Sequence, residues 1–226
     1  MQEFLLKYLP NLSGKVPDFL LAIRDTFIME LWAGAIGFVL GMFLGITLTV
    51  TRKGGILENK VVFQILDKIT NLFRSIPFII LLTALMPLSR AIMGTAIGIQ
   101  GAIVPLVFGS VPFFTRQVQS ALAEMDEGLI EAAESMGLSP VEIIFRGYLR
   151  ESIGPLARAT TITAISLLGL TAMAGVVGAG GLGDFAVRYG HDRNMADITW
   201  ATVIVLVAAV SIVQVVGDRI ARKNTH

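Results

Sequence analysis

The sequence contains no cysteine, only two histidines and few charged residues. Without cysteine, the chain can form no disulfide, no thiolate nucleophile and no thiolate metal site. The two histidines, His191 and His226, are too few and too far apart in the sequence to build a histidine-based metal centre. Charged residues make up 15% of the 226 residues, whereas an average soluble domain carries about 25%.

Hydrophobic residues, in contrast, make up 54% of the chain, and the mean hydropathy is +0.73. A water-soluble domain of this length could not bury so much apolar surface in one core. The composition therefore predicts a protein whose solvent is a lipid bilayer. Together with a net charge of only +1, it excludes disorder, nucleic-acid binding and a disulfide-stapled secreted fold as the main character of the chain.

Sequence motifs for catalysis are absent as well. The chain has no G-x-x-x-x-G-K-[ST] loop that could hold ATP phosphates. It also has no nucleophile elbow and no His-Glu-x-x-His zinc motif. We therefore expect no enzymatic activity, and no metal or cofactor bound by this chain itself.

The charged residues leave long gaps between them, and each gap predicts a membrane-spanning helix. Four runs of 20 to 25 residues carry no charge: Leu31–Thr51, Ala91–Thr115, Ala159–Gly183 and Ile198–Gly217. A helix of about 20 apolar residues crosses the roughly 30 Å hydrocarbon layer of a bilayer. Four spans follow from these runs.

A fifth uncharged run, Ser75–Ser89, has only 15 residues. By itself it is compatible with a re-entrant segment. It becomes a full span if the helix begins near Ile69 and Arg74 snorkels to the near interface; Arg74 is otherwise an intramembrane charge, which favours a functional role. We predict an all-α, polytopic membrane protein with five transmembrane helices and a helical hairpin on its cytoplasmic side.

The two ends of the chain are predicted to lie outside this domain. Glu3, Pro10 and Lys15 interrupt the pattern of a cleavable signal peptide. We expect residues 1–22 to form a lead-in on the extracytoplasmic side, residues 23–216 the transmembrane domain and residues 217–226 a cytoplasmic tail.

Lysine and arginine predict the orientation in the membrane, because they accumulate in cytoplasmic loops. If the N-terminus lies outside, eleven of them are cytoplasmic: Arg52, Lys53, Lys60, Lys68, Arg116, Arg146, Arg150, Arg158, Arg219, Arg222 and Lys223. Six are then extracytoplasmic: Lys7, Lys15, Arg24, Arg90, Arg188 and Arg193. The bias favours an N-terminus outside and a C-terminus in the cytoplasm.

The longest segment between two strong spans, residues 116–158, has the pattern of a helix, a turn and a second helix. Apolar residues at steps of three or four predict one helix face: Leu122, Met125, Leu129, Ala133 and Met136. Gly137 is a natural left-handed helix stop. Ser139, Pro140 and Glu142 then have the spacing of a capping box with proline at the first helical position. The pattern alone fits a docking surface and a simple connector equally well.

The same segment resembles the EAA loop of bacterial ATP-binding cassette importer permeases. Glu131-Ala132-Ala133, three further residues and Gly137 match the first half of the family pattern. The second half retains Leu149, but Gly147 and Arg150 replace the isoleucine and proline of the family. Four more stretches resemble the methionine permease branch in order and spacing: residues 73–82, 94–100, 177–183 and 217–220. The resemblance covers about residues 23–222.

This resemblance implies a type I permease that pairs with a second copy of itself and binds two cytoplasmic ATPase subunits. ATP and Mg would be bound by those subunits, and substrate would arrive from an extracytoplasmic substrate-binding protein. The EAA loop would insert into a groove on each ATPase subunit and transmit its closure. The residues implied in this coupling are Glu131, Ala132, Ala133, Gly137, Leu138, Ser139, Pro140 and Glu142.

Glycines are concentrated in two places. Small residues on one face of the first span predict close helix packing: Gly34, Gly37, Gly41 and Gly45. At the outer end of the fourth span, dense glycines weaken the helix and favour a flexible gate over tight packing, mainly on the family resemblance. The candidate gate residues are Met173, Gly175, Gly178, Gly180 and Gly181.

The predicted function is the permease subunit of an ATP-driven amino-acid importer, for methionine, in the bacterial cytoplasmic membrane, working by alternating access. One alternative is an ion-coupled secondary transporter, which would keep ionisable groups near the bilayer centre; the four strong spans have none. The other is a non-transporting membrane scaffold, which would need no ATPase partner.

Overall fold

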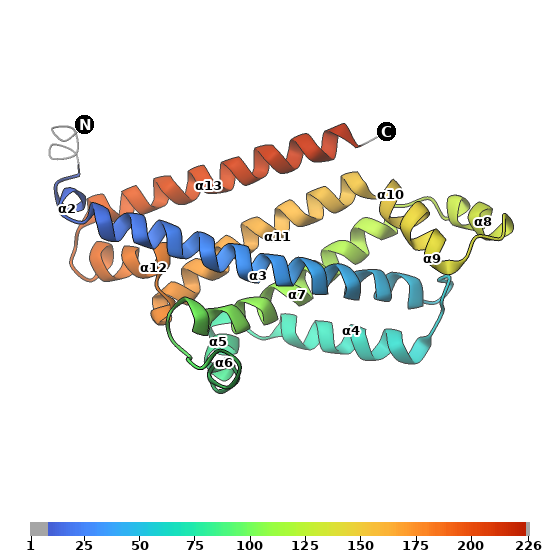
Figure 1. The fold of residues 1–226 in the computed structure, drawn as a ribbon, viewed down its shortest axis with the longest axis horizontal. Coiled ribbons are helices and arrows are strands. Elements are labelled where there is room, and N and C mark those ends of the chain that lie inside the picture. The colour runs from blue at the N-terminus through green and yellow to red at the C-terminus, as the bar shows by residue number, and fades with distance from the viewer. Residues whose placement is uncertain (1–8, 225–226) are drawn as a thin grey trace. The chain divides into compact units, whose positions relative to one another are not determined.

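The computed structural model describes residues 9–224. The first eight residues of the predicted lead-in and residues 225–226 of the predicted tail lie outside this part. The described chain forms helices and turns without strands, which confirms the all-α prediction (Figure 1). The α-helices are α2 (Pro10–Ser13), α3 (Val16–Thr51), α4 (Lys60–Ser75), α5 (Phe78–Ala84), α6 (Met86–Met93), α7 (Gly98–Ala123), α8 (Glu127–Ser135), α9 (Pro140–Glu142), α10 (Leu149–Glu151), α11 (Ile153–Ala174), α12 (Gly181–Phe185) and α13 (Ala196–Lys223).

Three wider, π-helical stretches adjoin these helices. They are η1 (Ile143–Tyr148), η2 (Gly175–Ala179) and η3 (Ala186–His191). Such stretches are rare in proteins and are often found at functional sites. Two of them, η1 and η2, fall in the two segments for which the sequence predicts a function.

The chain divides into two compact units. The first contains the residues up to Ala35, Pro77–Gly109 and Ala164–Ile212. The second contains Ile36–Ile76, Ser110–Thr163 and the residues from Val213. Each unit has its own apolar core, and the long helices α3, α7, α11 and α13 contribute residues to both.

Four helical segments of the described chain are long and apolar enough to cross a membrane. They are Val16–Thr51, Gly98–Ala123, Ile153–Ala179 and Ala196–Lys223. Each overlaps one of the four long uncharged runs. The helices extend beyond those runs, so the predicted boundary at residues 22–23 falls inside α3, and residues 217–223 of the predicted tail belong to α13.

The fifth span, predicted as one helix from about Ile69, is wrong in this form. Helix α4 ends at Ser75, and Ile76 is extended, with φ −87° and ψ 123°. The residue before a proline is biased away from helical backbone, and Pro77 itself has no N–H to continue the ladder. The chain resumes as the short helices α5 and α6, separated at Leu85.

The glycines of α3 bring α7 close to it inside the second unit. A Cβ atom on Gly37 would lie 2.8 Å from the Ser110 hydroxyl, and one on Gly41 would lie 2.7 Å from the Phe114 ring. The contact continues one turn further, at Gly45. The predicted packing role is therefore confirmed for these three glycines, and the sequence could not reveal that their partner, α7, belongs to the same chain.

In the first unit, α2 is hydrogen-bonded to the first turn of α13. The backbone N–H and side-chain amide of Asn11 both donate to the Asp197 carboxylate, each at 2.9 Å. The backbone N–H of Leu12 donates to the same group at 3.3 Å. Asp197 thus holds α2 against the first turn of α13.

Candidate functional site

The hairpin predicted in the second unit begins with a new helix rather than a continuation of α7. Helix α7 ends at Ala123, and Asp126 caps α8 by accepting a hydrogen bond of 2.8 Å from the Gly128 backbone N–H. The prediction of one apolar face through this segment is wrong, because the interruption resets the helical period. Leu122 and Ala133 are buried, whereas Leu129 and Met136 are exposed.

The turn between the two arms of the hairpin is a Schellman motif. Gly137 has φ +77°, its N–H donates to the Glu134 carbonyl at 2.9 Å, and the Leu138 N–H donates to the Ala133 carbonyl at 3.2 Å. These are the two bonds by which this motif satisfies the last carbonyls of a helix. The predicted left-handed stop at Gly137 is confirmed, and a side chain at this position would strain the backbone.

The second arm starts with the predicted capping box. The Ser139 hydroxyl accepts from the Glu142 N–H at 3.4 Å, and the Glu142 carboxylate accepts from the Ser139 N–H at 3.0 Å. This backbone hydrogen bond, followed by one from the Ser139 hydroxyl, lowers the pKa of Glu142. Pro140 occupies the first helical position. The arm then runs through η1 and α10, which contain the two positions that depart from the family pattern, Gly147 and Arg150.

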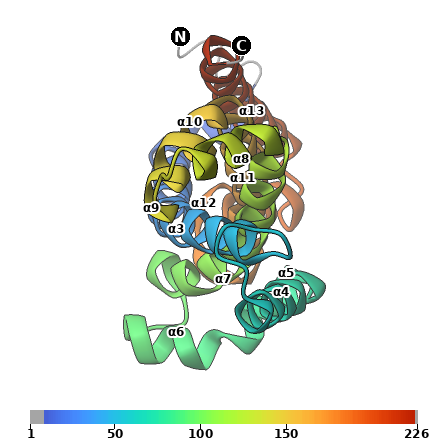
Figure 2. The same ribbon diagram turned by 90° about the vertical axis from the view of Figure 1, so that its right-hand side faces the viewer.

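One side of the hairpin is anchored in the apolar core of the second unit. Ala133 from the first arm and Ile143 and Tyr148 from the second arm are buried there. They pack in a cluster with Val50, Phe114, Val118, Ala121, Leu122, Leu156 and Ala159. An ion pair of 3.3 Å between Arg158 and Glu124 also joins the start of α11 to the segment after α7. Figure 2 looks onto α8, α9 and α10, which these contacts hold together.

The other side of the hairpin exposes apolar side chains. Leu129 is 51% exposed, Met136 72%, Val141 62% and Phe145 65%. Glu131 and Ala132 lie on the exposed side of α8, and Ser139 and Pro140 are exposed at the turn. Large apolar side chains gathered at a surface are typical of a site for another protein. The geometry therefore favours a docking surface over a mere connector.

The second candidate site, in the first unit, is the glycine-rich end of α11. The helix ends at Ala174, and the chain turns through η2 into α12. Gly178, Gly180 and Gly181 have φ values of +94°, +83° and +77°, which L side chains rarely adopt. The fourth span is therefore broken at this point, with non-helical backbone angles at Val177 and Gly178. These glycines do not, however, stand in a weakened regular helix, because each provides a left-handed backbone conformation that the turn requires.

The break also depends on very close backbone contacts. A Cβ atom on Gly175 would lie 2.5 Å from the Asp184 backbone nitrogen, and one on Gly183 would collide with the Ala172 carbonyl. From α3, the buried Thr26 hydroxyl accepts a hydrogen bond of 2.8 Å from the Leu182 N–H and thereby caps α12. Thr26 carries no sequence signal, since threonine is ordinary in an apolar helix.

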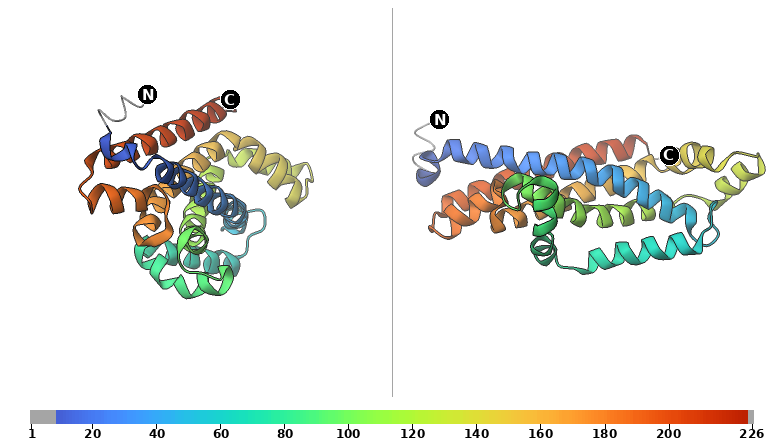
Figure 3. Two further views of the ribbon diagram at one scale, coloured as in Figure 1. Left: turned by 60° about the vertical axis from the view of Figure 1, so that its left-hand side comes forward. Right: turned by 60° about the horizontal axis from the view of Figure 1, so that its bottom comes forward.

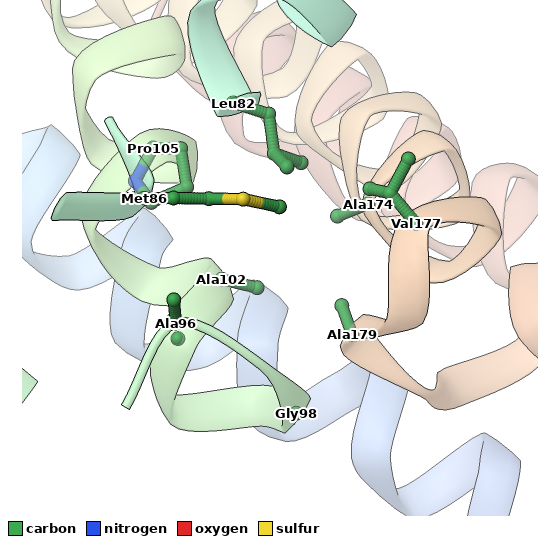
Figure 4. Close-up of a pocket in the computed structure, with 10 residues that line it drawn as sticks. Leu82, Met86, Ala96, Gly98, Ala102, Pro105, Ala174, Val177 and Ala179 are labelled. Carbon is green, nitrogen blue, oxygen red and sulfur yellow. The ribbon is translucent and has the colours of Figure 1, made fainter. Parts of the chain in front are cut away.

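Ala174, Val177 and Ala179 of the break line a small apolar cavity (Figure 4). Its other walls are Leu82 of α5, Met86 of α6, and α7 with the preceding turn: Ala96, Gly98, Gly101, Ala102 and Pro105. Figure 4 shows the Met86 side chain extending into this space. The cavity volume is about 10 Å³, room for about one water molecule, so the cavity is closed to an amino acid in this conformation.

None of the five predicted gate residues is among the residues that line this cavity, and neither is Arg74. Met173 is 40% exposed and is not among the lining residues, because it precedes Ala174 on a different side of α11. Arg74 lies in the last turn of α4 with an exposed side chain. Leu82, Ala96 and Gly98 of the cavity wall fall in stretches that resemble the methionine permease branch, but the sequence gives no sign that these stretches meet around one cavity.

Among residues 9–224, no group of three or more His, Asp or Glu side chains is placed to hold a metal ion. The hairpin has exposed apolar side chains, and the glycine-rich break has an apolar cavity beside it.

The four long apolar helices of the described chain are typical of a membrane protein. Residues 37–225 match the family described as binding-protein-dependent transport system inner membrane component, and the chain belongs to this family.

Relatives within the family share most of the chain. It is 44% identical over 210 residues to the probable D-methionine transport system permease protein MetI of Vibrio cholerae, covering 92% of this chain and 93% of the relative. It is 41% identical over 214 residues to the methionine import system permease protein MetP of Bacillus subtilis, covering 95% and 96%.

A solved structure has the same fold. The chain superimposes on a chain of an inward-facing conformation of the MetNI methionine ABC transporter with a TM-score of 0.90. The two chains are 42% identical, and the match covers 94% of this chain and 99% of the other.

Proposed function

We propose that this chain is the membrane permease subunit of an ATP-driven importer of methionine. Two copies form the translocation pathway, two cytoplasmic ATPase subunits bind ATP and Mg, and an extracytoplasmic binding protein delivers the amino acid. The observation that carries this proposal is the hairpin, whose buried side is fixed in the core and whose apolar side is exposed. The names and the fold of the relatives support methionine as the substrate.

In this proposal the hairpin transmits force from the ATPase subunits. The Schellman turn and the capping box fix the angle between its two arms, since both leave few backbone groups free to rearrange. A push on the exposed side chains at Leu129, Met136, Val141 and Phe145 is then passed through Ala133 and Ile143 to the core around Phe114 and Val118. A flexible connector would absorb the same push.

The glycine break acts as the gate in the same proposal. Its positive-φ glycines do not have the backbone angles of a regular helix. A change of their φ and ψ angles therefore moves α12 relative to α11. Movement of Ala174, Val177 and Ala179 away from Met86 would enlarge the cavity of Figure 4. Alternating access requires two such arrangements that differ by only a few kcal/mol.

For the orientation, we place the second membrane crossing in α4 and α5. Helix α4 has 16 residues, about 24 Å at 1.5 Å per residue, and α5 has 7. A broken helix at membrane depth is tolerated where protein or water surrounds the break. Five crossings put the two ends of the chain on opposite sides of the membrane, and the lysine and arginine bias then favours an N-terminus outside and a C-terminus in the cytoplasm.

The test is reconstitution of the chain in lipid vesicles with a partner ATPase and a substrate-binding protein from the same organism. We expect uptake of radiolabelled methionine that needs the binding protein and Mg-ATP on the hairpin side. Both enantiomers are measured, because the relatives are named for D-methionine and for methionine. Uptake driven by an ion gradient without the ATPase, or no uptake of methionine, would overturn the proposal.

A further inference from the structure

The hydroxyl group of Thr26 joins α3 to the glycine-rich break, both within the first unit. Thr26 is 2% exposed. Its hydroxyl donates to the Ala22 carbonyl at 3.0 Å and accepts from the Leu182 N–H at 2.8 Å. Because its one hydrogen is used within α3, the hydroxyl oxygen meets Leu182 as an acceptor only. The group is therefore fixed in orientation by one bond on each side.

The Leu182 N–H depends on this acceptor. Leu182 lies in the first turn of α12, where backbone N–H groups have no partner within the helix. The residue before α12 is Gly180, which has no side chain that could cap it. Leu182 is 1% exposed, so water does not reach its N–H in place of Thr26. A buried donor left without a partner is more costly than the loss of an ordinary hydrogen bond.

An apolar contact supports the same break one turn further along α3. Met29 is fully buried and belongs to one apolar cluster with Ala174 and Ala179. A Cβ atom on Gly181 would lie 2.7 Å from the Thr26 hydroxyl and 3.0 Å from the Met29 Cε atom. Figures 1 and 3 show α12 beside the first part of α3. The break thus rests on α3 through an apolar surface and a single hydrogen bond.

We infer that Thr26 is a positioning residue of the transport cycle, whose hydrogen bond to the Leu182 N–H, the latch bond, holds α12 on α3 while the gate is closed. The inference rests on the proposed function and adds a residue of the first span to the gate. Apolar contacts are non-directional, so they tolerate a shift of α12. A hydrogen bond weakens steeply outside a narrow range of distance and angle, so the latch bond does not.

The latch bond affects the cycle because it stabilises only one of two arrangements. When the break opens and α12 moves away from α3, the bond is lost whether or not position 26 has a hydroxyl. Removal of the hydroxyl therefore destabilises the closed arrangement and leaves the open one unchanged. A change of about tenfold in their ratio corresponds to about 1.4 kcal/mol, within the range of penalties for a buried donor without a partner.

The experiment compares two variants of Thr26 with a matched control. Thr26→Val has nearly the shape of threonine but no hydroxyl, and Thr26→Ser retains the hydroxyl without the methyl group. Thr202→Val is the control. Thr202 of α13 is also 2% exposed, and its hydroxyl donates to the Ile198 carbonyl at 3.0 Å, four residues earlier, as in Thr26. Within residues 9–224, no N–H donates to the Thr202 hydroxyl.

The first measurement is hydrogen exchange at the Leu182 amide, resolved from overlapping peptides of the assembled complex without nucleotide. We expect exchange about tenfold faster in Thr26→Val, because local opening becomes easier by the same factor. Thr26→Ser and Thr202→Val should exchange at the unsubstituted rate. An unchanged rate in Thr26→Val, or an equal increase in Thr26→Ser, would overturn the inference, because the hydroxyl would then not be what holds α12.

The second measurement is ATP hydrolysis and methionine uptake by the complex in lipid vesicles. In the proposed cycle the gate opens outward as ATP closes the ATPase pair, so a less stable closed gate favours that closure. Thr26→Val should therefore raise hydrolysis without the binding protein several-fold and lower the methionine taken up per ATP. Thr26→Ser and Thr202→Val should change neither. Unchanged hydrolysis in Thr26→Val would overturn the inference, and so would a parallel fall of hydrolysis, uptake and complex yield, which a purely structural cap predicts.

The inference and the proposed function fail separately in these measurements. If the unsubstituted complex takes up no methionine, but Thr26→Val exchanges faster at Leu182 and hydrolyses more ATP without the binding protein, the latch bond stands and the substrate is wrong. If uptake is normal and Thr26→Val hydrolyses ATP as the unsubstituted complex does, the proposed function stands and the role of Thr26 is wrong.

Discussion

The two glycine-rich regions of the molecule use the same residue for different physical purposes. On α3, the glycines at 37, 41 and 45 repeat every four residues, lie in regular helix and leave room for side chains of α7. At the break between α11 and α12, the glycines at 178, 180 and 181 are unevenly spaced and have positive φ. In the first region, the absence of a Cβ atom lets α7 approach α3 closely. In the second region, it allows the backbone to adopt positive φ angles.

Spacing is what separates the two uses in the sequence. A constant step of four residues keeps side chains on one helix face, which predicts a contact between rigid elements. Irregular spacing cannot form a face, and so it predicts a turn. The two uses also respond differently to substitution. At a helix contact, the size of the new side chain determines how much the free energy of unfolding falls. At a turn, the loss depends on whether the new residue can adopt a positive φ.

The largest effect is expected at the contact, from Gly45→Val. A Cβ atom there would lie 2.6 Å from the Val118 side chain and 2.9 Å from the Thr115 carbonyl oxygen. Overpacking of this kind lowers the free energy of unfolding by about 1–3 kcal/mol or more. The midpoint of thermal unfolding in detergent and the yield of folded protein should both fall. Gly34→Ala is the control, because its nearest neighbour, Leu167, is at an ordinary 3.4 Å; equal losses in both variants would refute the distinction.

A second effect is expected at the hairpin, which contains a third kind of glycine. Gly137 is exposed, has φ +77° and has no atom within 4 Å of its Cβ position. Gly137→Val should strain the turn by about 1–2 kcal/mol and disturb the angle between the arms. Uptake and substrate-stimulated ATP hydrolysis should fall together, while the amount in the membrane stays normal. Gly137→Asn, which tolerates this backbone, should retain most activity; a fully active valine variant would make the hairpin a connector.

Gly178→Ala should have a smaller effect and isolates the backbone from the contact. No atom lies within 4 Å of the Cβ position at either Gly178 or Gly169 of α11, but only Gly178 has positive φ, at +94°. We expect Gly178→Ala to lower the free energy of unfolding by about 1 kcal/mol and Gly169→Ala to raise it by about 0.5–1 kcal/mol. A lower midpoint of thermal unfolding for Gly178→Ala and a higher one for Gly169→Ala would confirm this prediction. Midpoints that shift in the same direction would contradict it.

The smallest effect is expected from pH at the capping box, a helix start that needs no glycine. The pKa of Glu142 is lowered from its ordinary 4.5 by the Ser139 N–H, so the folded hairpin favours the ionised form. The resulting stability is present above the ordinary pKa and is lost as the pH falls through the lowered value. Hydrogen exchange of residues 138–148, corrected for intrinsic rates, should rise a few-fold in acid. Glu142→Gln should be insensitive to the same change, because it has no carboxyl group to titrate; a pH response that survives in this variant would mean that the capping box is not its source.

Local signals in the sequence predicted local structure well. The Schellman glycine and the Ser139–Glu142 box are defined by residues a few positions apart, and both are present as expected. The apolar face predicted through Leu122 and Met136 failed, because Asp126 starts a new helix and periodicity alone does not reveal such an interruption. The fifth span failed at Pro77, whose effect on the preceding residue outweighed the hydropathy of the run.

Contacts between residues far apart in the sequence could not be predicted from it. The cap from Thr26 to the Leu182 N–H joins residues 156 positions apart, and the Arg116 contacts with α4 span 45 to 49 positions. Nothing in either local pattern identifies the partner, since both residues are ordinary where they stand. The cavity around Met86 was missed for the same reason: its walls come from four separate stretches of chain.

The carboxylate that holds Asn11 and Leu12 has a consequence for how the protein is made. Asp197 lies 186 residues after Asn11, so a ribosome working at about 5–20 residues per second needs roughly 10–40 s to add it after Asn11. Throughout that interval α2 lacks its hydrogen bonds to Asp197, although α3 has already been synthesised. During co-translational insertion, α2 and α3 must therefore stay accessible until α13 has been synthesised. A nascent chain that stalls before α13 exposes an incomplete first unit to quality-control proteases.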